Sequence, residues 1–506
     1  MSSLNDLTNY NTPLQQNAID IRTEYIEPIT SSAHRHTFRL DQTGYLDTNS
    51  MLVFKLQSVG AVNDGTCRVN QWNGALGGIK RVIFQIGDNI INDIQDVYKY
   101  STLKNMNMPP SMRNNFLGHY LGNSLWLDVQ KNGQTGSADK FQTDPNALQT
   151  YFQEYTGTTG SIVPNYKKSG TDFGKYDDGA GSAINSSNIF NDKAKNNQYG
   201  IPLGMLIPAL KGQKIPLFLF EKQRILLTFE FNSAEIYCNN IKASKLAYTG
   251  AGNGVCDAGD VVPVDVQMVV DYLVMPTDVQ NELVQKTQQQ GGYKLEFYDV
   301  VNVEKNIVAG TQGQEQLVEH RIGQNNREVH NIIMWKDVAL DTMINFADTK
   351  RGIPLMGKQG CRGFAREEYN CNIDGRDEFD HFLFNPVSQY NEMSAVLGKD
   401  LQVSRPHYIN DENSVSAQLT PRSAGIQGTM KPLGLSLRNG EPLVVGGGRQ
   451  IGNYPIVWKW KRTSNSTRFQ QQPVDDYAIK CNYFCEVSRV ANIMATDKGM
   501  NVVVSY

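Results

Sequence analysis

The chain has 506 residues, of which 40% are hydrophobic and 20% are charged, and this balance excludes an intrinsically disordered protein. Its 44 glycines and 19 prolines indicate many turns and long loops rather than long helices. The formal net charge is −3 and no run of about five or six lysines and arginines occurs, which argues against strong binding to nucleic acid.

No feature of the sequence indicates secretion or membrane insertion. Residues 1–22 contain neither the basic segment nor the apolar core of a signal peptide. The longest apolar stretches, such as Ile201–Leu210, contain glycine and proline and are too short to span a bilayer. The seven cysteines are scattered and odd in number, unlike a secreted disulfide framework. We therefore expect a protein that is made and folded in the reducing interior of a cell, without a membrane span.

The N-terminal residues 1–23 predict an extended arm. They are rich in Asn and Gln and their apolar residues are isolated, a pattern that favours neither a helix nor a packed strand. Apolar side chains in such a segment become ordered by filling grooves on a partner. The four candidate anchors are Leu4, Leu7, Tyr10 and Leu14.

Residues 24–276 predict a first β-domain. Runs of β-forming residues bounded by Gly, Asn, Asp or Pro indicate strands at 51–56, 79–86 and 224–231. The clearest strand is 264–274, because its apolar residues alternate with period two. One face of that strand is expected to carry Val264, Val266, Met268, Val270, Tyr272 and Val274.

Two other kinds of segment interrupt these strands. Helical spacing of apolar residues at 92–108 and 114–125 predicts short helices. From 131 to 200 the composition shifts to Gly, Ser, Asn, Asp and Thr with few apolar residues. A loop of this length would leave backbone polar groups without partners if it were buried, so we expect it to project from the surface as a tower.

Residues 277–292 predict a linker helix between two domains. Thr277 and Gln280 form a T-x-x-Q capping box, and the helical pattern continues to Gln289. Gly291 and Gly292 then stop the helix.

Residues 293–506 repeat the plan of the first domain. Early β-type residues such as Leu295 and Trp335 precede a loop-rich stretch at 341–452, after which strands resume near Ile456 and Ile479. Early strands, a long insertion and late strands therefore occur twice. This layout predicts an all-β protein of two tandem β-sandwiches with short helices and long surface loops.

Candidate metal ligands occur near the start of the first domain. His34 and His36, with Asp41 and Gly44, imitate the metal motif of cupin enzymes. The match fails because Asp stands where Glu is expected, the glycine spacing is wrong and no second half-motif follows. Two histidines on one strand face could bind a metal, but polar surface is the simpler interpretation.

Four clusters in the second domain receive structural interpretations. Cys481 and Cys485 share an apolar strand face and are expected to be small buried hydrophobes. The acidic residues 374–380 lack the order of a calcium loop and are interpreted as a solvated helix start. The glycines at 446–452 lack the Lys-Ser/Thr of a phosphate loop. The basic cluster is interpreted as the solvent face of a strand rather than a DNA contact, and it comprises Lys459, Lys461 and Arg462.

No H-E-x-x-H, G-x-S-x-G or Walker sequence occurs. We therefore expect no enzyme activity, no metal and no cofactor.

Several segments resemble the double-jelly-roll major capsid proteins of tailless DNA viruses, and most of all those of polinton-like viruses and virophages. Giant algal viruses and the adenovirus-hexon lineage are more distant. The similar segments look like the family's first strands, the close of its first jelly roll and its late loop and strand. They are 38–56, 78–87, 201–204, 215–231, 440–443 and 455–458.

The resemblance implies a fold and a function. It implies two tandem eight-stranded antiparallel jelly rolls and a major capsid protein that forms a homotrimer, a pseudo-hexameric capsomer of an icosahedral shell. The partners would be neighbouring capsomers and minor capsid proteins (penton or cement proteins), with the arm anchors binding between capsomers. The protein would assemble inside the host cell, reside in the virion and contact a host receptor through the tower.

Three other functions stay open at this point. One is an assembly scaffold of the same fold that is not part of the capsid. The second is a cupin-like or carbohydrate-binding β-sandwich protein, and the third is a receptor-binding or lectin module. A monomer in solution would favour the last two, whereas a trimer or larger assembly favours the shell.

Overall fold

The computed structural model describes most of the strands but not the longest loops. The described residues are 20–58, 67–69, 74–106, 121, 198–210, 214–220, 223–240, 261–308, 314–338, 367–397, 432–437, 447–463, 478–496 and 499–505. The four arm anchors lie outside these residues, as do tower residues 131–197 and all of the expected helix at 114–125 except residue 121. Those expectations stay predictions.

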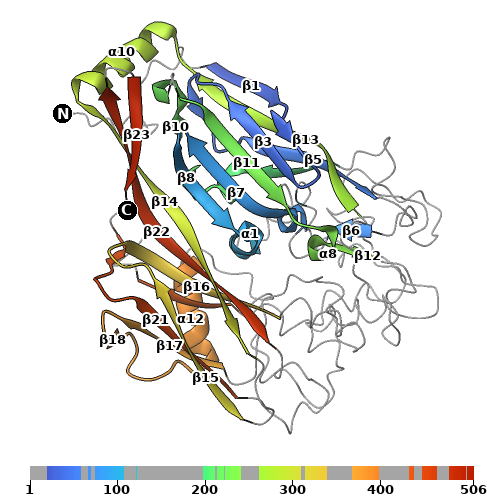
Figure 1. Ribbon diagram of the computed structural model, residues 1–506, viewed down its shortest axis with the longest axis vertical. Coiled ribbons are helices and arrows are strands. Elements are labelled where there is room, and N and C mark those ends of the chain that lie inside the picture. The colour runs from blue at the N-terminus through green and yellow to red at the C-terminus, as the bar shows by residue number, and fades with distance from the viewer. Residues whose placement is uncertain are drawn as a thin grey trace, which may run out of the picture.

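The first domain is a sandwich of two antiparallel sheets (Figure 1). One sheet has the order β1 (Asp20–Ile26), β13 (Val261–Val274), β5 (Met51–Ser58) and β9 (Gln198–Pro202). The other has the order β3 (Arg35–Leu40), β11 (Ile225–Phe231), β7 (Ile79–Ile86) and β8 (Asn89–Gln95). Short strands extend this domain: β2 (Thr30–Ser31), β4 (Tyr45–Leu46), β10 (Ile215–Pro216), β6 (Cys67–Val69) and β12 (Cys238–Asn240).

The second domain is a sandwich of the same kind. Its first sheet has the order β14 (Gly292–Ile307), β22 (Ile479–Thr496), β16 (Glu328–Val338) and β19 (Leu433–Ser436). Its other sheet has the order β15 (Glu315–Gly323), β21 (Ile456–Thr463), β17 (Glu367–Ile373) and β18 (Arg376–Asp377). Two further strands join the first of these sheets, β20 (Arg449–Gln450) and β23 (Gly499–Ser505).

The two domains have the same topology. The eight principal strands are β1, β3, β5, β7, β8, β9, β11 and β13 in the first domain and β14 to β19, β21 and β22 in the second. Counted along the chain, they form one sheet in the order first, eighth, third, sixth in both domains. The other sheet has the order second, seventh, fourth, fifth in both. This is the connectivity of the eight-stranded jelly roll, so the predicted fold class and the predicted repeat are confirmed.

The helices also follow the repeat. α1 (Val97–Met106) and α12 (Pro386–Leu397) both lie between the fifth and sixth strands of their domains, and α10 (Thr277–Gln289) joins the domains. β13 leads into α10 and β14 leads away from it, and α10 lies at the top of the view in Figure 1. The shorter helices are α7 (Leu203–Leu206), α8 (Ala234–Tyr237), η4 (Gly74–Gly78), η9 (Pro208–Leu210) and η10 (Leu217–Phe220).

The structure corrects the expected arm and tower boundaries. Residues 20–23, assigned to the arm, belong to β1, which pairs with β13 from Asp20 to Ile26. Residues 198–200, assigned to the tower, belong to β9. In both cases a polar composition hid a strand whose order comes from its neighbour in the sheet.

The linker helix forms as predicted, but its cap does not. Pro276, with φ −51° and ψ 141°, is the N-cap residue, and Thr277 is already helical. Gln280 donates its side-chain amide to the Met275 carbonyl oxygen at 2.9 Å. Because proline has no backbone N–H, the reciprocal bond of a capping box cannot form here.

Two other sequence predictions were wrong in part. Residues 92–94 belong to strand β8, and the helix expected from 92 begins only at Val97, after Asp96 with φ 53°. The stretch 341–452, expected to be loop-rich, contains β17, β18, α12, β19 and β20. Weak local patterns in these segments are overridden by tertiary packing.

Strand β13 departs from simple alternation at one residue. Asp265 has φ 50°, and the register with β5 shifts between Val264 and Gln267. Such a bulge moves the residues before it to the opposite face. Val264 is therefore half-buried, whereas Val266, Met268, Val270 and Tyr272 face the core. Val274, at the end of the strand, is also only half-buried.

Candidate functional site

The two jelly rolls meet along a buried seam. In Figure 1, β14, β22 and β23 run from the second domain upward beside the first domain towards α10. β8 and η9 of the first domain contact this ribbon, and side chains of α1 bond to residues of β22. One continuous hydrophobic cluster includes core residues of the first domain together with Leu295, Phe297 and Phe484 of the second. The rings of Tyr100 and Phe484 lie 5.9 Å apart across the seam.

Glu486 is the centre of the polar contacts in the seam. It is only 3% exposed, and its carboxylate accepts hydrogen bonds from the Tyr100 hydroxyl and the Asn331 amide. Lys104 Nζ lies 2.8 Å from Glu486 Oε1. Because a buried carboxylate is costly unless it is paired, these partners from α1 and β16 make a defined position of α1 over β22 favourable.

A second buried charge pair lies in the same seam. Arg489 Nη1 donates to Asp299 Oδ2 at 2.7 Å and to the Ile91 carbonyl oxygen at 2.9 Å. Asn92 Nδ2 donates to Asp299 Oδ1 at 2.8 Å. One cluster therefore joins β8 to both β14 and β22.

The N-terminal end of α1 and the last residue of β8 make a third connection. Lys99, which is 2% exposed, donates from Nζ to Asn482 Oδ1 at 2.7 Å. Asn302 Nδ2 donates to the Gln95 carbonyl oxygen at 3.0 Å. Hydrophobic burial alone would allow the two surfaces to pack in many alignments, whereas directional bonds of this kind select one of them.

None of the hydrogen-bonded polar residues of the seam was singled out from the sequence, although β22 carries a signal. Its positions Asn482, Phe484 and Glu486 alternate with core residues and would face solvent in a one-sided sheet. All residues from 481 to 489 are buried. An aromatic residue on the face opposite the core indicates that both faces of a strand are covered.

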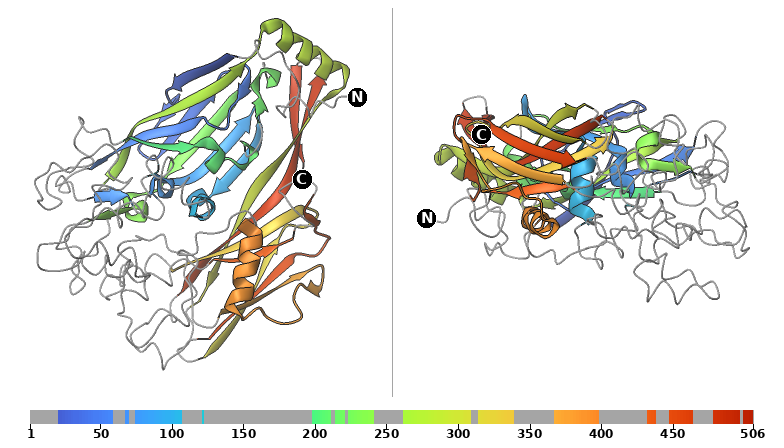
Figure 2. Two further views of the ribbon diagram at one scale, coloured as in Figure 1. Left: turned by 180° about the vertical axis from the view of Figure 1, so that it is seen from behind. Right: turned by 90° about the horizontal axis from the view of Figure 1, so that it is seen from below.

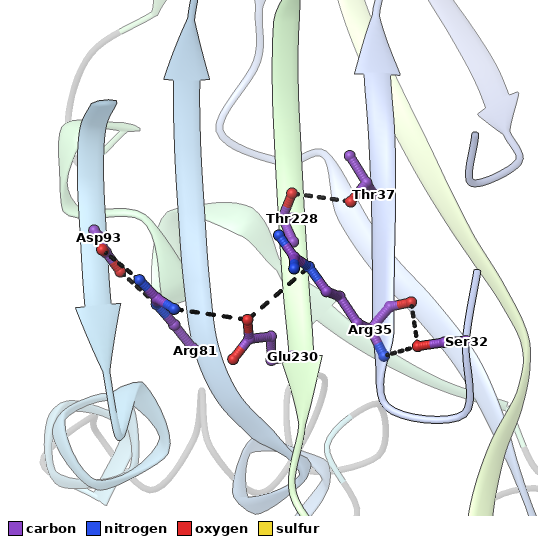
Figure 3. A network of polar contacts seen from close by, with 7 residues as sticks. All are labelled: Ser32, Arg35, Thr37, Arg81, Asp93, Thr228 and Glu230. Atoms are coloured by element: carbon purple, nitrogen blue, oxygen red, sulfur yellow. Dashed lines mark hydrogen bonds and ion pairs between the residues drawn. The ribbon is translucent and has the colours of Figure 1, made fainter. Parts of the chain in front are cut away.

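The sheet of β3, β11, β7 and β8 and the sheet of β15, β21, β17 and β18 carry pairs of charged residues on their outer faces. On the first domain, Arg81 bonds Asp93 through two nitrogens, each at 2.7 Å (Figure 3). Glu230 lies between Arg81 at 3.7 Å and Arg35 at 4.0 Å. The hydrogen bond to Asp93 raises the pKa of Arg81. This ladder of paired charges crosses β3, β11, β7 and β8, and keeps the face compatible with water.

The second domain carries a similar ladder, which includes the basic cluster. Lys459 pairs with Asp377 at 2.9 Å, and Lys461 pairs with Glu315 at 3.0 Å. The hydrogen bond from Lys459, followed by that from Asn372, lowers the pKa of Asp377. The predicted solvent face is confirmed for both lysines but is wrong for Arg462, which is 2% exposed and donates to Gln316 at 2.8 Å.

The two histidines do not form a metal pair. His34 is exposed, whereas His36 is 4% exposed, and its ring packs edge-on against Phe231. His36 Nδ1 lies 3.0 Å from Ser31 Oγ. Burial, and then the neighbouring His34, lower the pKa of His36. The interpretation as polar surface was therefore wrong for His36, because the alternation of β3 turns this side chain inward.

The cysteine prediction is confirmed. Cys371, Cys481 and Cys485 are free and buried, and they belong to the hydrophobic core of the second domain. Burial raises the pKa of the Cys485 thiol to about 12 and that of Cys371 well above its ordinary value. The thiols of Cys371 and Cys485 therefore stay protonated and unreactive at neutral pH.

The acidic cluster is a hairpin rather than the expected helix start. Asp374, with φ 51°, and Gly375 form the turn between β17 and β18. The Gly452 amide donates to the Asp374 carboxylate at 3.0 Å, and the Gly448 amide donates to Glu328 at 2.7 Å. Carboxylates of the same chain thus occupy amides that a phosphate loop would offer to its ligand.

The described part of the chain offers little coordination chemistry. Within it, no three His, Cys, Asp or Glu side chains are placed to hold a metal ion. No helix among those residues is long and apolar enough to cross a membrane.

Comparison with known proteins identifies the fold. No protein-family model matches the chain, and no curated protein matches it. Among solved structures, it is similar to PBCV-1 VP54 fitted into a reconstruction of the virophage Sputnik, with 9% identity over 98% of this chain and 100% of that chain and a TM-score of 0.52. It is also similar to the Sputnik virophage structure, with 9% identity over 96% of this chain and 88% of that chain and a TM-score of 0.52. The chain is likewise similar to a quasi-atomic model of the PBCV-1 virus capsid, with 10% identity over 98% of this chain and 100% of that chain and a TM-score of 0.50. The likeness shows the double-jelly-roll fold over the whole chain.

Replacing Arg489 with Met should weaken the seam. The change leaves the buried Asp299 without its cation, and removing one partner of a buried pair typically costs about 3–5 kcal/mol. The free energy of unfolding, measured by chemical denaturation, should fall by that amount. Lys294→Met is the control, since the Lys294–Glu296 pair on the same ribbon is exposed and should contribute less than about 1 kcal/mol. Equal losses for the two variants would contradict the assigned role of Arg489.

Proposed function

We propose that this protein is the major capsid protein of a tailless DNA virus, a structural subunit of the virion and not an enzyme. The observation that carries the proposal is the repeated jelly roll, joined across a buried seam into one unit. The solved structures that share this architecture over nearly the full chain come from the PBCV-1 capsid and the Sputnik virophage.

We propose that three copies of the chain form a homotrimer, which is the capsomer. Three copies place six similar sandwiches around one axis, so that a threefold assembly can tile as a near-hexagon. The charge ladders at Arg81–Asp93 and Lys461–Glu315 suit outer walls that stay hydrated until neighbouring capsomers meet. Minor capsid proteins would fill positions that a hexagonal tile cannot.

The cupin-like alternative loses its support. It rested on His34 and His36, of which His34 is exposed and His36 is buried against Phe231. A lectin module would need only one domain, whereas here the two domains share one hydrophobic cluster. An assembly scaffold of the same fold predicts the same trimer but would be absent from mature particles.

Analytical ultracentrifugation tests the proposal. The purified chain of 56.6 kDa should sediment as a trimer whose subunit contacts bury more than roughly 2,000 Å² in total, as in obligate assemblies. A folded monomer at every concentration would exclude the capsid role. If the trimer forms but mass spectrometry of mature virions lacks the chain, the scaffold is the correct reading.

The N-terminal segment is proposed to bind between capsomers through Leu4, Leu7, Tyr10 and Leu14. Each buried apolar side chain contributes on the order of 1–3 kcal/mol before the entropy of ordering is subtracted. Deleting residues 1–19 leaves β1 intact, so trimers should keep their melting temperature while closed particles become less stable or less abundant. Particles as robust as those of the full chain would exclude this role, and loss of the trimer would assign the segment to the subunit itself.

A further inference from the structure

Each half of the seam has a counterpart that no other described residue of the same chain is seen to cover. β22 is buried on both faces from 481 to 489, and its outer face bonds to side chains of α1 and to the backbone of β8. Its counterpart β13 is the eighth strand of the first domain. There, the core residues alternate with half-buried residues from 266 to 272. Within the described residues, the outer face of the first sheet is therefore covered in the second domain and only half-buried in the first.

For the helices α1 and α12, the enclosed member of the pair belongs to the first domain and the exposed member to the second. Residues 97–103 of α1 are all buried, since α1 is enclosed between the two domains. Its counterpart α12 buries one side only, through Gln389, Met393 and Val396. At the start of α12, Val387 is 72% exposed, and Phe384 just before it is 60% exposed.

The uncovered sheet presents an apolar row. Tyr25 on β1 pairs with Val269 on β13, which pairs with Met51 on β5, which in turn pairs with Pro202 on β9. Tyr25 is 75% exposed, and the other three residues are half-buried. Ile21 on the same face of β1 is 65% exposed. We call these five residues the β1 face, and we call Phe384 and Val387 the α12 tip.

We propose that the α12 tip of one copy packs on the β1 face of the next copy, so that the contact between subunits repeats the seam within a subunit. The inference rests on the proposed trimer and names its two contacting surfaces. One chain cannot bring them together, because β1 and α12 lie far apart along the long axis in both Figure 1 and the left view of Figure 2.

A second copy fits this arrangement because every chain carries one surface of each kind. A contact between two different surfaces is head-to-tail, and head-to-tail contacts close into rings when the rotation per copy allows it. In a ring of three, three internal seams would alternate with three contacts between copies. The exposed apolar side chains would then lie in the buried centre of each contact, where binding energy concentrates.

Photo-crosslinking at residue 25 tests the contact directly. The photoreactive residue p-benzoylphenylalanine replaces Tyr25 in the full-length chain, and irradiated protein is run on a denaturing gel and mapped by mass spectrometry. The expected result is covalent dimers and trimers, with adducts on residues 379–397. The same residue placed at Leu317, which is 55% exposed on the outer face of β15, should give no such ladder.

Three results would overturn the inference while leaving the proposed function intact. Adducts on residues 1–19 would show that the N-terminal segment covers the β1 face. Adducts on the β1 face of another copy, with covalent dimers as the largest product, would show a two-fold contact. A trimer in the ultracentrifuge without any adduct between copies would show that the β1 face is free. If no trimer forms at all, the proposed function fails first.

A charge exchange gives an independent readout. Tyr25→Glu alone and Val387→Lys alone should each raise the concentration at which the trimer dissociates by roughly tenfold or more, since each places an unpaired charge at a buried contact. The double variant places Glu opposite Lys at every contact and should recover part of the loss. Tyr454→Glu, at a residue that is 68% exposed elsewhere, is the matched control. Losses that simply add in the double variant would contradict direct contact.

Discussion

The structure depends on the need to cover the outer face of the sheet that contains β14 and β22. A sandwich normally buries one face of each sheet and leaves the other to water. Here the second face carries Phe484 and Leu295 among buried charges, so it is stable only when other residues cover it. The first domain supplies that cover through α1 and β8, and the two jelly rolls become one structural unit.

The chemistry of the seam explains how the cover acquires a fixed orientation. Apolar contacts favour burial but tolerate sliding, whereas Glu486 and Asp299 accept directional bonds from groups of both domains. Any displacement would leave these carboxylates buried without partners. The repeated topology extends the same logic outward. Among the described residues, the sheet around Tyr25 lacks a covering helix, and Val387 at the start of α12 lacks a surface to pack on.

Sequence patterns predicted the parts of the fold that local periodicity determines. The strands at 51–58, 79–86 and 225–231 and the helix from 277 follow from alternation or from glycine stops. The bulge at Asp265 was not predicted, nor was helix α12, because neighbouring strands and not local residues set them. The seam was missed for the same reason, since Asn92 and Asp299 are separated by 207 positions. Only the presence of Phe484 opposite the core residues of β22 hinted at it.

The most direct test of this account is a reconstruction of the purified oligomer by electron cryomicroscopy. The account predicts a closed ring of six similar sandwiches, in which the contact of α12 with β1 between copies superposes on the contact of α1 with the β14–β22 ribbon within each copy. A ring in which the β1 face points to solvent, or an assembly related by two-fold axes through that face, would contradict it.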